Sequence, residues 1–207
     1  MVVSKRLQIG VLALQGDVAP HCSILERLNV APLRVTSPDQ IAEIDGLVLP
    51  GGESTTIGLL LSKSGLKAAI HDRHRQYGLP LFGTCAGMIL LAKRIVETPD
   101  QPHLDLLDIT VQRNAFGRQR ESCEALVDAP TFGPSPLRAL FIRAPIVVAA
   151  SPRVDVLARW KDRIVLVRDG TLLASAFHPE LADDDRLHRY FLEIVQANRT
   201  AHVRASG

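Results

Sequence analysis

The chain has 207 residues, of which 46% are hydrophobic and 22% are charged, and these fractions exclude a disordered chain and a fibrous protein. Its formal net charge at pH 7 is only +2, so it lacks the strong field that attracts nucleic acid or anionic lipid. The apolar stretch 81–92 is shorter than the roughly 20 residues that a membrane-spanning helix needs. We therefore expect a small molecule or another protein as the partner, with no nucleic acid and no membrane.

The three cysteines, Cys22, Cys85 and Cys123, are widely spaced and odd in number. This spacing fits neither a zinc site nor a disulfide framework, and it favours a reducing compartment. An apolar run at 7–14 follows two basic residues, as in a signal peptide, but Gln8 interrupts it and no small-residue cleavage site follows. We therefore expect a cytoplasmic protein.

The first half of the chain alternates between strand-like and helix-like segments. Short apolar runs predict strands at 7–14, 33–35, 46–49 and 80–83. Helices are predicted at 18–28, 54–62, 66–77 and 87–94, together with a helix start at Ser37-Pro38. Strands that alternate with helices in this way favour a mostly parallel sheet with helices on both faces.

From about Asp105 onward, short β-rich runs follow one another, separated by turn signals such as Asp169-Gly170. These runs lie at 106–112, 123–127, 138–142, 146–150, 164–168 and 172–177. A final helix is predicted over 184–197, with an apolar face made of Leu187, Tyr190, Phe191, Ile194 and Val195. The predicted fold class is three-layer α/β, with a mostly parallel central sheet, helices on both faces and an additional antiparallel β-rich portion. We expect one domain over residues 1–207, with its core at about 7–197.

In an open parallel sheet, ligands bind beyond the carboxyl ends of the strands. The loops that follow Leu14, Leu49 and Phe82 are therefore predicted to lie at one edge of the sheet. The last strand, which ends near Phe177, can bring its following loop to the same edge. These loops are where the catalytic residues are expected.

Cys85 lies where an apolar strand turns directly into a helix, within Gly83-Thr84-Cys85-Ala86-Gly87. This pattern is the cysteine version of a nucleophile elbow, whose tight turn requires small neighbours on both sides. The free N–H groups and the positive end of the new helix favour the thiolate form. The N–H of Ala86 is then a candidate oxyanion-hole donor, typically worth about 3 kcal/mol. The alternative is a structural cysteine buried at a helix start.

A cysteine nucleophile needs a base, and His178 is the strongest candidate, because His178-Pro179-Glu180 follows the apolar run 172–177. Residues two apart in an extended chain project to the same side, so Glu180 is expected to orient the imidazole and stabilise its charged form. A surface turn explains the tripeptide equally well when it is taken alone. The catalytic interpretation therefore depends on the elbow at Cys85.

A second pair of histidines, His71 and His74, lies three residues apart on a predicted helix. Arginines flank both positions, and no further ligand cluster is present in the sequence. A solvated helix face is therefore favoured, and we expect no metal site.

The loop Pro50-Gly51-Gly52-Glu53-Ser54 lacks the Gly-Lys-Ser/Thr ending of a phosphate-binding loop. Its glycines let the backbone approach a ligand, and the N–H of Gly52 is a candidate for completing the oxyanion hole. Ser54 either contacts a ligand or caps the next helix. Arg113 and Arg143 lie in β-rich surroundings, where each is either a bidentate partner for a substrate carboxylate or a surface charge.

Together these motifs resemble the triad, or class I, glutamine amidotransferases. Within that superfamily, six segments in the same order resemble the family of glutaminase subunits of two-protein pyridoxal 5'-phosphate synthases. The segments are 12–16, 49–56, 83–88, 113–119, 141–145 and 177–181, and the resemblance extends over about 7–197. The cysteine elbow and His-Pro-Glu identify only the superfamily. The runs Gly-Gly-Glu-Ser-Thr-Thr, Arg-Asn-x-Phe-Gly-Arg-Gln and Ile-Arg-Ala-Pro indicate the family.

The resemblance implies that Cys85 attacks the side-chain amide of L-glutamine, giving a γ-glutamyl thioester and ammonia. It implies that His178 transfers the proton, that Glu180 orients His178, and that water then releases glutamate. The implied glutamine contacts are Gly52, Glu53, Ser54, Arg113, Ile142 and Arg143, and the sequence does not say which arginine binds the carboxylate.

Members of this family pass ammonia through a tunnel to a barrel-shaped synthase subunit, which is the partner that the resemblance implies, in a heteromeric complex. Such subunits are usually poorly active until docked, so Gln15 and its loop are candidate interface elements. Pyridoxal phosphate is a product of that complex, and no cofactor is expected in this chain.

Two other functions stay open at this point. One is a class I glutaminase subunit that serves a different amidotransferase, and the other is a non-catalytic docking subunit that keeps only the fold. The chain departs from the family at Asp105, where glycine is frequent, and in the tail beyond Asn198. Neither departure touches the residues of the expected triad.

Overall fold

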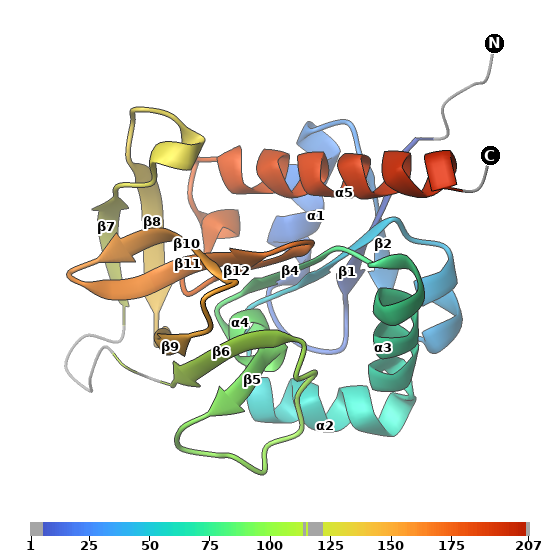
Figure 1. The fold of residues 1–207 in the computed structure, drawn as a ribbon, viewed down its shortest axis with the longest axis horizontal. Coiled ribbons are helices and arrows are strands. Elements are labelled where there is room, and N and C mark those ends of the chain that lie inside the picture. Colours follow the sequence, from blue (N-terminus) through green and yellow to red (C-terminus); the bar gives the residue numbers. More distant parts are fainter. Residues whose placement is uncertain (1–5, 114, 116–121, 206–207) are drawn as a thin grey trace.

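The computed structural model describes residues 6–113, 115 and 122–205, and its centre is a ten-stranded sheet (Figure 1). The helices on one face of the sheet are α1 (Val18–Arg27) and α5 (Arg186–Ala205). The helices on the other face are α2 (Ser54–Ser64), α3 (Leu66–Tyr77) and α4 (Ala86–Leu91). These three layers confirm the predicted α/β fold class.

The sheet has a parallel part and an antiparallel part. In spatial order its strands are β2 (Ala31–Val35), β1 (Gln8–Leu12), β3 (Gly46–Leu49), β4 (Leu81–Thr84), β12 (Leu172–Ser175), β11 (Arg163–Asp169), β9 (Ile146–Ala150), β6 (Leu107–Gln112) and β5 (Ala92–Ile95). The strands from β2 to β12 in this order are parallel to one another. From β12 to β6 each neighbouring pair is antiparallel, and β5 is parallel to β6.

The additional antiparallel portion that the sequence predicted is also present. A separate two-stranded antiparallel sheet is formed by β7 (Ser122–Val127) and β8 (Leu137–Ile142). A further strand, β10 (Asp155–Trp160), pairs with β11 off the main path of the sheet. The short 3₁₀ helices are η1 (Pro38–Ala42), η2 (Pro130–Phe132) and η3 (Pro179–Leu181).

Four local predictions differ from the structure. The helix predicted over 87–94 ends at Leu91, because the next residues leave the helix and pair with β6 as strand β5. Strand β10 was not predicted, and its register against β11 is irregular, which obscures the alternation of side chains that marks a strand. The helix start at Ser37-Pro38 gives only the 3₁₀ helix η1, and α5 continues beyond 197 to Ala205.

The parallel strands bring four loops to one edge of the sheet. Strands β1, β3, β4 and β12 are neighbours and run in the same direction, so the loops that follow them lie at their shared carboxyl ends. Strands β3, β4 and β12 are buried along their whole length, as expected for central strands covered on both faces. The prediction that these loops meet at one edge of the sheet is therefore confirmed.

Two glycines allow α4 to pack directly on the backbone of the sheet. A Cβ at Gly87 would lie 2.0 Å from the carbonyl oxygen of Leu49 on β3. A Cβ at Gly83 would lie 2.5 Å from the backbone of Gly87. Since no side chain fits at either contact, the turn between β4 and α4 is held tightly against β3.

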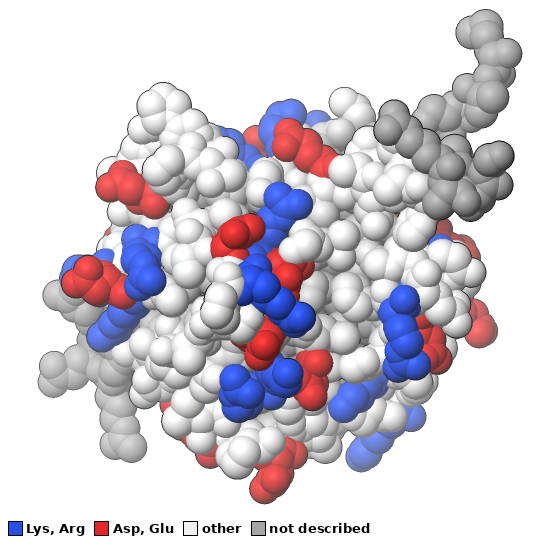
Figure 2. All heavy atoms as spheres, in the orientation of Figure 1, with Lys and Arg blue, Asp and Glu red and all other residues white. Residues whose placement is uncertain are grey.

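The surface shows no separation of charge that would indicate a polyanionic partner on the face drawn in Figure 2, where basic and acidic side chains are interspersed. Throughout the described ranges, helices fall short of the combined length and apolarity needed to cross a bilayer. The cysteines are free thiols: Cys22 is buried on α1, and Cys123 is half-buried on β7.

Candidate active site

Cys85 lies between β4 and α4 in a strained backbone conformation. Its φ of 49° and ψ of −102° place a non-glycine residue at positive φ, which typically costs about 1–3 kcal/mol. The N–H of Cys85 donates a 2.8 Å hydrogen bond to Ser175 O on β12, and its own carbonyl accepts from Met88 N at 3.1 Å. The strain is thus maintained by the neighbouring strand and by the first turn of the helix, as in a nucleophile elbow.

The thiol of Cys85 lies at the base of a pocket of about 410 Å³ at the carboxyl edge of the sheet. The side chain is 7% exposed, and Sγ donates a 3.7 Å hydrogen bond to Ile142 O at the end of β8. The pocket is lined by Gln15, Gly16, Asp17, Gly52, Glu53, Ser54, Cys85, Ala86, Ile89, Arg113, Ile142, Arg143, His178 and Leu181. Nine of the predicted site residues, Cys85 included, therefore line this pocket. Glu180 does not line it but contacts His178, which does.

His178 and Glu180 form a buried pair after β12. The His178 Nδ1–H donates a 2.7 Å hydrogen bond to Glu180 Oε1, and the two residues are 4% and 6% exposed. The N–H of His178 donates to Leu140 O at 2.9 Å, which anchors the histidine to β8. The pair does not form through an extended chain as predicted, because Glu180 lies in the 3₁₀ turn η3. The turn brings the carboxylate back toward the ring.

The charge of His178 is affected by burial and by both of its neighbours, Cys85 and Glu180. Burial disfavours the imidazolium, but hydrogen bonds and charges from Cys85 and Glu180 outweigh burial and raise the pKa of His178 from 6.5 to about 10. Burial raises the pKa of Glu180 above its ordinary value, and the hydrogen bond from His178 opposes that shift. With Nδ1 held by Glu180, Nε2 is the ring nitrogen left to exchange a proton with Cys85.

Gly51 makes room for the imidazole. A Cβ at this position would lie 2.4 Å from His178 Cε1 and 3.0 Å from His178 Nδ1. The sequence suggested that the two glycines let a ligand approach the backbone, but at Gly51 the group that approaches is the ring of His178. Packing against the bare backbone of Gly51 therefore helps to fix the position of the His178 ring.

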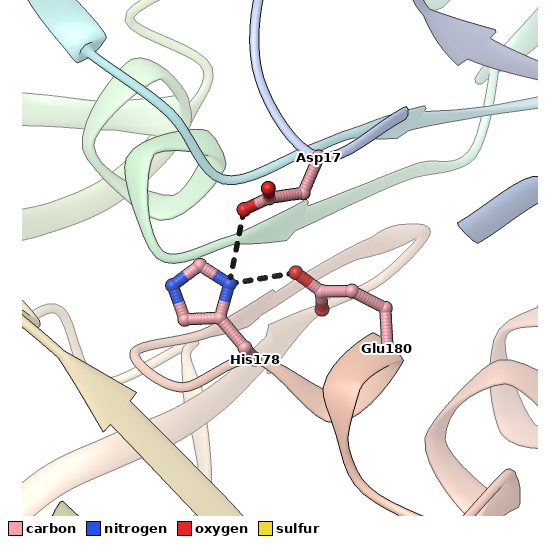
Figure 3. Close-up of side chains that lie close together, drawn as sticks. All are labelled: Asp17, His178 and Glu180. Atoms are coloured by element: carbon pink, nitrogen blue, oxygen red, sulfur yellow. Dashed lines mark hydrogen bonds and ion pairs between the residues drawn. The ribbon is translucent and has the colours of Figure 1, made fainter. Parts of the chain in front are cut away.

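Asp17 is a carboxylate at this site that the sequence reasoning did not assign. Its Oδ2 lies 3.6 Å from His178 Nδ1, the atom that already donates to Glu180, and Figure 3 shows the two carboxylates reaching this nitrogen from different directions. Among the described residues, Asp17, His178 and Glu180 form the only grouping with metal-ligand spacing. His71 and His74 do not belong to it, and His74 Nδ1 bonds to Leu79 O instead.

The loop after β1 is closely attached to the loop after β3. The side-chain oxygen of Gln15 accepts a 2.8 Å hydrogen bond from Glu53 N, and the N–H of Asp17 donates to Gly51 O at 3.1 Å. A Cβ at Gly16 would lie only 1.8 Å from Gly51 O. The loops therefore meet backbone to backbone, next to the candidate oxyanion-hole residue Gly52.

Arg113 is held in the pocket by a polar network. Its Nη1 donates to Gln101 Oε1 at 2.8 Å, and its Nη2 forms an ion pair with Glu53 Oε1 at 3.3 Å. Gln101 is 6% exposed and also accepts from the hydroxyls of Thr55 and Thr98 at 3.2 Å. Its role had no signal in the sequence, because the network joins segments that are far apart along the chain.

The remaining predicted contacts differ in how they are held. Glu53 is the N-cap of α2, where its carboxylate accepts from Thr56 N at 2.7 Å, so the capping alternative for Ser54 is wrong. The Ser54 Oγ is buried and has no hydrogen-bond partner among the described residues.

Arg143 has a φ of 45° and is exposed, and its guanidinium contacts no acceptor within the described ranges. Asn114 and residues 116–119 of the arginine-rich motif lie outside the described residues.

A strained cysteine at a strand–helix turn, with a histidine and a carboxylate converging on it at the edge of a parallel sheet, is the arrangement of an α/β cysteine hydrolase. A sequence model of the SNO glutamine amidotransferase family matches residues 11–197. The chain belongs to the SNO glutamine amidotransferase family.

Relatives and solved structures agree with this assignment. The pyridoxal 5'-phosphate synthase subunit PdxT of Carboxydothermus hydrogenoformans is 52% identical over 189 residues, which covers 91% of this chain and 98% of the relative. The subunit of the same name from Thermotoga petrophila is 52% identical over 190 residues, covering 92% of this chain and 100% of the relative. A crystal structure of a glutamine amidotransferase has a TM-score of 0.87 at 48% identity, and the match covers 91% of this chain and 98% of that one.

Proposed function

We propose that this protein is the glutaminase subunit of a pyridoxal 5'-phosphate synthase, which hydrolyses L-glutamine to L-glutamate and ammonia. The observation that carries the proposal is the convergence of Cys85, His178 and Glu180 in one pocket of a chain that belongs to a glutamine amidotransferase family. The names of its relatives supply the synthase to which the ammonia is delivered.

In the first half of the reaction, the Cys85 thiol gives its proton to His178 Nε2, and the resulting thiolate attacks the amide carbon of glutamine. The negative charge that develops on the amide oxygen is stabilised by the N–H groups of Ala86 and Gly52. The N–H of Ala86 begins α4, and helix-start amides lack intrahelical acceptors. As the C–N bond breaks, His178 Nε2 gives its proton to the nitrogen that leaves as ammonia. A thioester between Cys85 and the γ-carbonyl remains.

The second half of the reaction uses the same groups in reverse. Acylation removes the negative charge from Cys85, so the hydrogen bond and the charge by which Cys85 raises the pKa of His178 are both lost. The imidazole is then able to accept a proton from water as the water oxygen attacks the thioester. The tetrahedral intermediate expels the thiolate and releases glutamate. Glu180 keeps Nδ1 protonated in both halves, which leaves Nε2 as the atom that gains and loses the proton.

The pocket carries complementary charges for the α-ammonium and α-carboxylate of glutamine. We assign the α-carboxylate to Arg113, because its guanidinium is already oriented by Gln101 and Glu53. The Glu53 carboxylate is the candidate partner for the ammonium group. Ser54 borders the pocket with a hydroxyl that has no partner in the described part of the chain, and Ile142 and Arg143 border the pocket on the side of β8. A preorganised arginine binds a carboxylate at a smaller entropic cost than a mobile one.

Arg113→Gln is expected to raise the KM for glutamine by roughly 10- to 100-fold, because it removes charge-assisted hydrogen bonds to the substrate carboxylate. The kcat is expected to change much less, since this carboxylate is bound equally in the ground state and in the transition state. Steady-state kinetics in the presence of the synthase partner measure both constants. Arg75→Gln is the control, because Arg75 is an exposed residue of α3 that forms an ion pair with Asp72 and lies outside the pocket. Equal KM values in Arg113→Gln and the parent would contradict the assignment.

Gly51→Ala is expected to lower kcat by about 100-fold, because the added methyl group displaces the imidazole of His178 by the order of an ångström. Gly51 is not among the glycines with positive φ, so alanine fits its backbone conformation, and the unfolding temperature is expected to change by only a few degrees. Gly170→Ala is the control for activity: a Cβ there meets no atom within 4 Å, and its φ of +58° makes alanine costly to stability, but it lies outside the pocket and is expected to leave kcat unchanged. An unchanged kcat in Gly51→Ala would show that the ring is not held against this backbone during turnover.

The partner is tested by measuring glutamate release by the purified chain with and without a pyridoxal 5'-phosphate synthase barrel subunit. We expect the barrel to form a complex with the chain, to stimulate hydrolysis and to receive the ammonia. Stimulation by a different glutamine-dependent synthase, with none by this barrel, would favour a glutaminase that serves another amidotransferase. No hydrolysis under any condition, together with no labelling of Cys85 by a thiol-directed glutamine analogue, would favour a docking subunit.

We also propose that the whole chain forms one glutamine amidotransferase domain. One cluster of buried hydrophobic residues extends from Ile9 on the first strand to Val195 on the last helix, and it includes Val127 and Leu137 of the separate two-stranded sheet. The free thiols of all three cysteines support a location in the reducing cytoplasm.

A further inference from the structure

A second cluster of polar side chains lies behind the candidate triad, on the face of the sheet that α1 and α5 cover. His21 on α1, Thr84 on β4 and His188 on α5 are each 0% exposed. His21 Nε2 lies 3.2 Å from Thr84 Oγ1, and His21 Nδ1 lies 3.0 Å from His188 Nε2. The reaction described above uses none of these groups. Polar groups this deeply buried are costly unless they bond to one another or to something else.

This cluster meets the triad at the far oxygen of Glu180. Oε1 of Glu180 accepts from His178, whereas Oε2 is buried and makes no hydrogen bond of ordinary geometry with the described residues. The polar atom in ion-pair range of Oε2 is His21 Nε2, at 3.4 Å. A buried carboxylate oxygen without a donor is unstable, and catalytic hydrogen bonds are often longer in a resting enzyme than in the complex with substrate. His21 is thus the donor available to this carboxylate from behind.

The protonation of the two histidines follows from their surroundings. Burial, with the nearby charges of His188 and His178, lowers the pKa of His21 well below 6.5. Burial lowers the pKa of His188 to about 4, against a smaller opposing effect of Asp185. Both rings are therefore neutral near pH 7, and each carries one N–H.

The position of each N–H can be assigned from the bonds. His188 Nδ1 is buried without a hydrogen-bond partner among the described residues, so it is the nitrogen that lacks the proton, because an orphaned acceptor is less costly than an orphaned N–H. His188 then donates from Nε2 to His21 Nδ1. This leaves the proton of His21 on Nε2, where it faces Thr84 Oγ1 and Glu180 Oε2. The donors run in one direction, from His188 through His21 to Glu180.

We propose that His21 is a positioning residue for the triad, which holds Glu180 from behind so that Oε1 stays directed at His178 Nδ1. The proposal rests on the proposed glutaminase function and adds a residue to its machinery. It also accounts for the choice between two carboxylates, because Asp17 Oδ2 lies 3.6 Å from the same Nδ1 (Figure 3). Fixing the rotation of Glu180 favours its short bond to His178 over the longer contact with the half-exposed Asp17.

The test compares two polar replacements that differ in reach. His21→Gln carries an amide nitrogen close to the position of the original Nε2, whereas His21→Asn carries one close to Nδ1 and cannot reach Glu180. We expect His21→Asn to lower kcat by about tenfold or more with little change in KM, as is typical when the group that orients a catalytic residue is removed. We expect His21→Gln to retain most of the parent kcat. Cys22→Ala is the control for a small change on the buried face of α1.

A second readout follows His178 itself in the isolated full chain, without glutamine turnover. The imidazole is titrated by NMR and assigned by its loss in His178→Asn. The groups that face His178 are Cys85, Glu180 and Asp17, while His188 faces His21 from α5. In His21→Asn we expect the ring to titrate at lower pH and the Nδ1 proton to move upfield, because its carboxylate partner is no longer fixed. His21→Gln and Cys22→Ala are expected to resemble the parent.

The two readouts separate a failure of this inference from a failure of the proposed function. Parent-like titration and kcat in His21→Asn would overturn the positioning role, as would equal losses in His21→Asn and His21→Gln. Absence of hydrolysis in the parent itself would count against the proposed function, and the NMR comparison would still decide whether His21 positions Glu180.

Discussion

Replacing Cys85 by alanine is expected to reduce glutamine hydrolysis by roughly 10⁴- to 10⁶-fold, the range found when the nucleophile of a triad is removed. The loss is this large because no other thiol can take over: Cys22 lies on α1 and Cys123 on β7, and neither lines the pocket. The backbone of the elbow is held by bonds to Ser175 O and from Met88 N that do not involve the sulfur. The variant is therefore expected to fold and to retain glutamine binding.

The measurement is glutamate release in the presence of the synthase partner, with the uncatalysed rate subtracted. Cys123→Ala is the matched control, because it removes a half-buried thiol away from the pocket and is expected to retain parent activity. A thiol-directed glutamine analogue should add its mass to the parent and to Cys123→Ala, but not to Cys85→Ala. Glutaminase activity that survives in Cys85→Ala would remove the thioester from the mechanism.

Replacing Glu180 by glutamine is expected to lower kcat by about 10³- to 10⁴-fold, in the range seen when the orienting carboxylate of a triad becomes an amide. The side chain keeps its shape, but the amide no longer selects the tautomer with the proton on Nδ1 of His178. Nε2 then carries the proton at the stage where it should accept one. Circular dichroism is expected to show the parent fold, so the loss belongs to the chemistry and not to unfolding.

The same variant has a predicted pH dependence. In the parent, Cys85 and Glu180 outweigh burial and raise the pKa of His178 to about 10, so the ring stays an imidazolium up to alkaline pH. Glu180→Gln removes a negative charge that stabilises the imidazolium, so the ring loses its proton at lower pH. The alkaline limb of kcat/KM, or of labelling by the glutamine analogue, is therefore expected to shift to lower pH. Glu193→Gln changes an exposed glutamate of α5 and is the control. Coincident alkaline limbs would contradict the role of Glu180.

The parallel part of the fold was predictable because its signals are local. Buried strands such as β3 and β4 are continuous apolar runs that end at glycine-containing turns, and these residues lie where the pattern placed them. Strand β5 was not predictable in the same way. The segment after Leu91 continues a sequence that is compatible with a helix, and only pairing with the distant β6 makes it a strand. Tertiary pairing overrides local preference there.

The site shows the same difference between residues with a local sequence signal and residues whose role depends on distant contacts. Cys85, His178 and Glu180 were identified from short motifs, each of which has a recognisable turn chemistry. Gly51 and Gln101 act through residues far away in the chain, so no local pattern reveals that one packs on His178 and the other holds Arg113.

His21 did leave one signal in the sequence. It lies three and four residues before Ile24 and Leu25, and therefore on the apolar face of α1, where a polar side chain requires a buried partner. The identity of that partner, however, depends on how α1 and α5 cross the sheet. Asp17 left no comparable signal, because a carboxylate in a surface loop is ordinary.

The contact between the loops after β1 and β3 has a mechanical consequence. Gly16 and Gly51 touch through bare backbone, and the Gln15 side chain bonds to the amide of Glu53. Because no flexible side chain lies between the two loops, a displacement of one loop is expected to displace the other, and the two loops move as one rigid unit at the edge of the sheet. A molecule that binds to Gln15 and displaces it would therefore also displace the backbone amide of Gly52, while the strands of the sheet keep their positions.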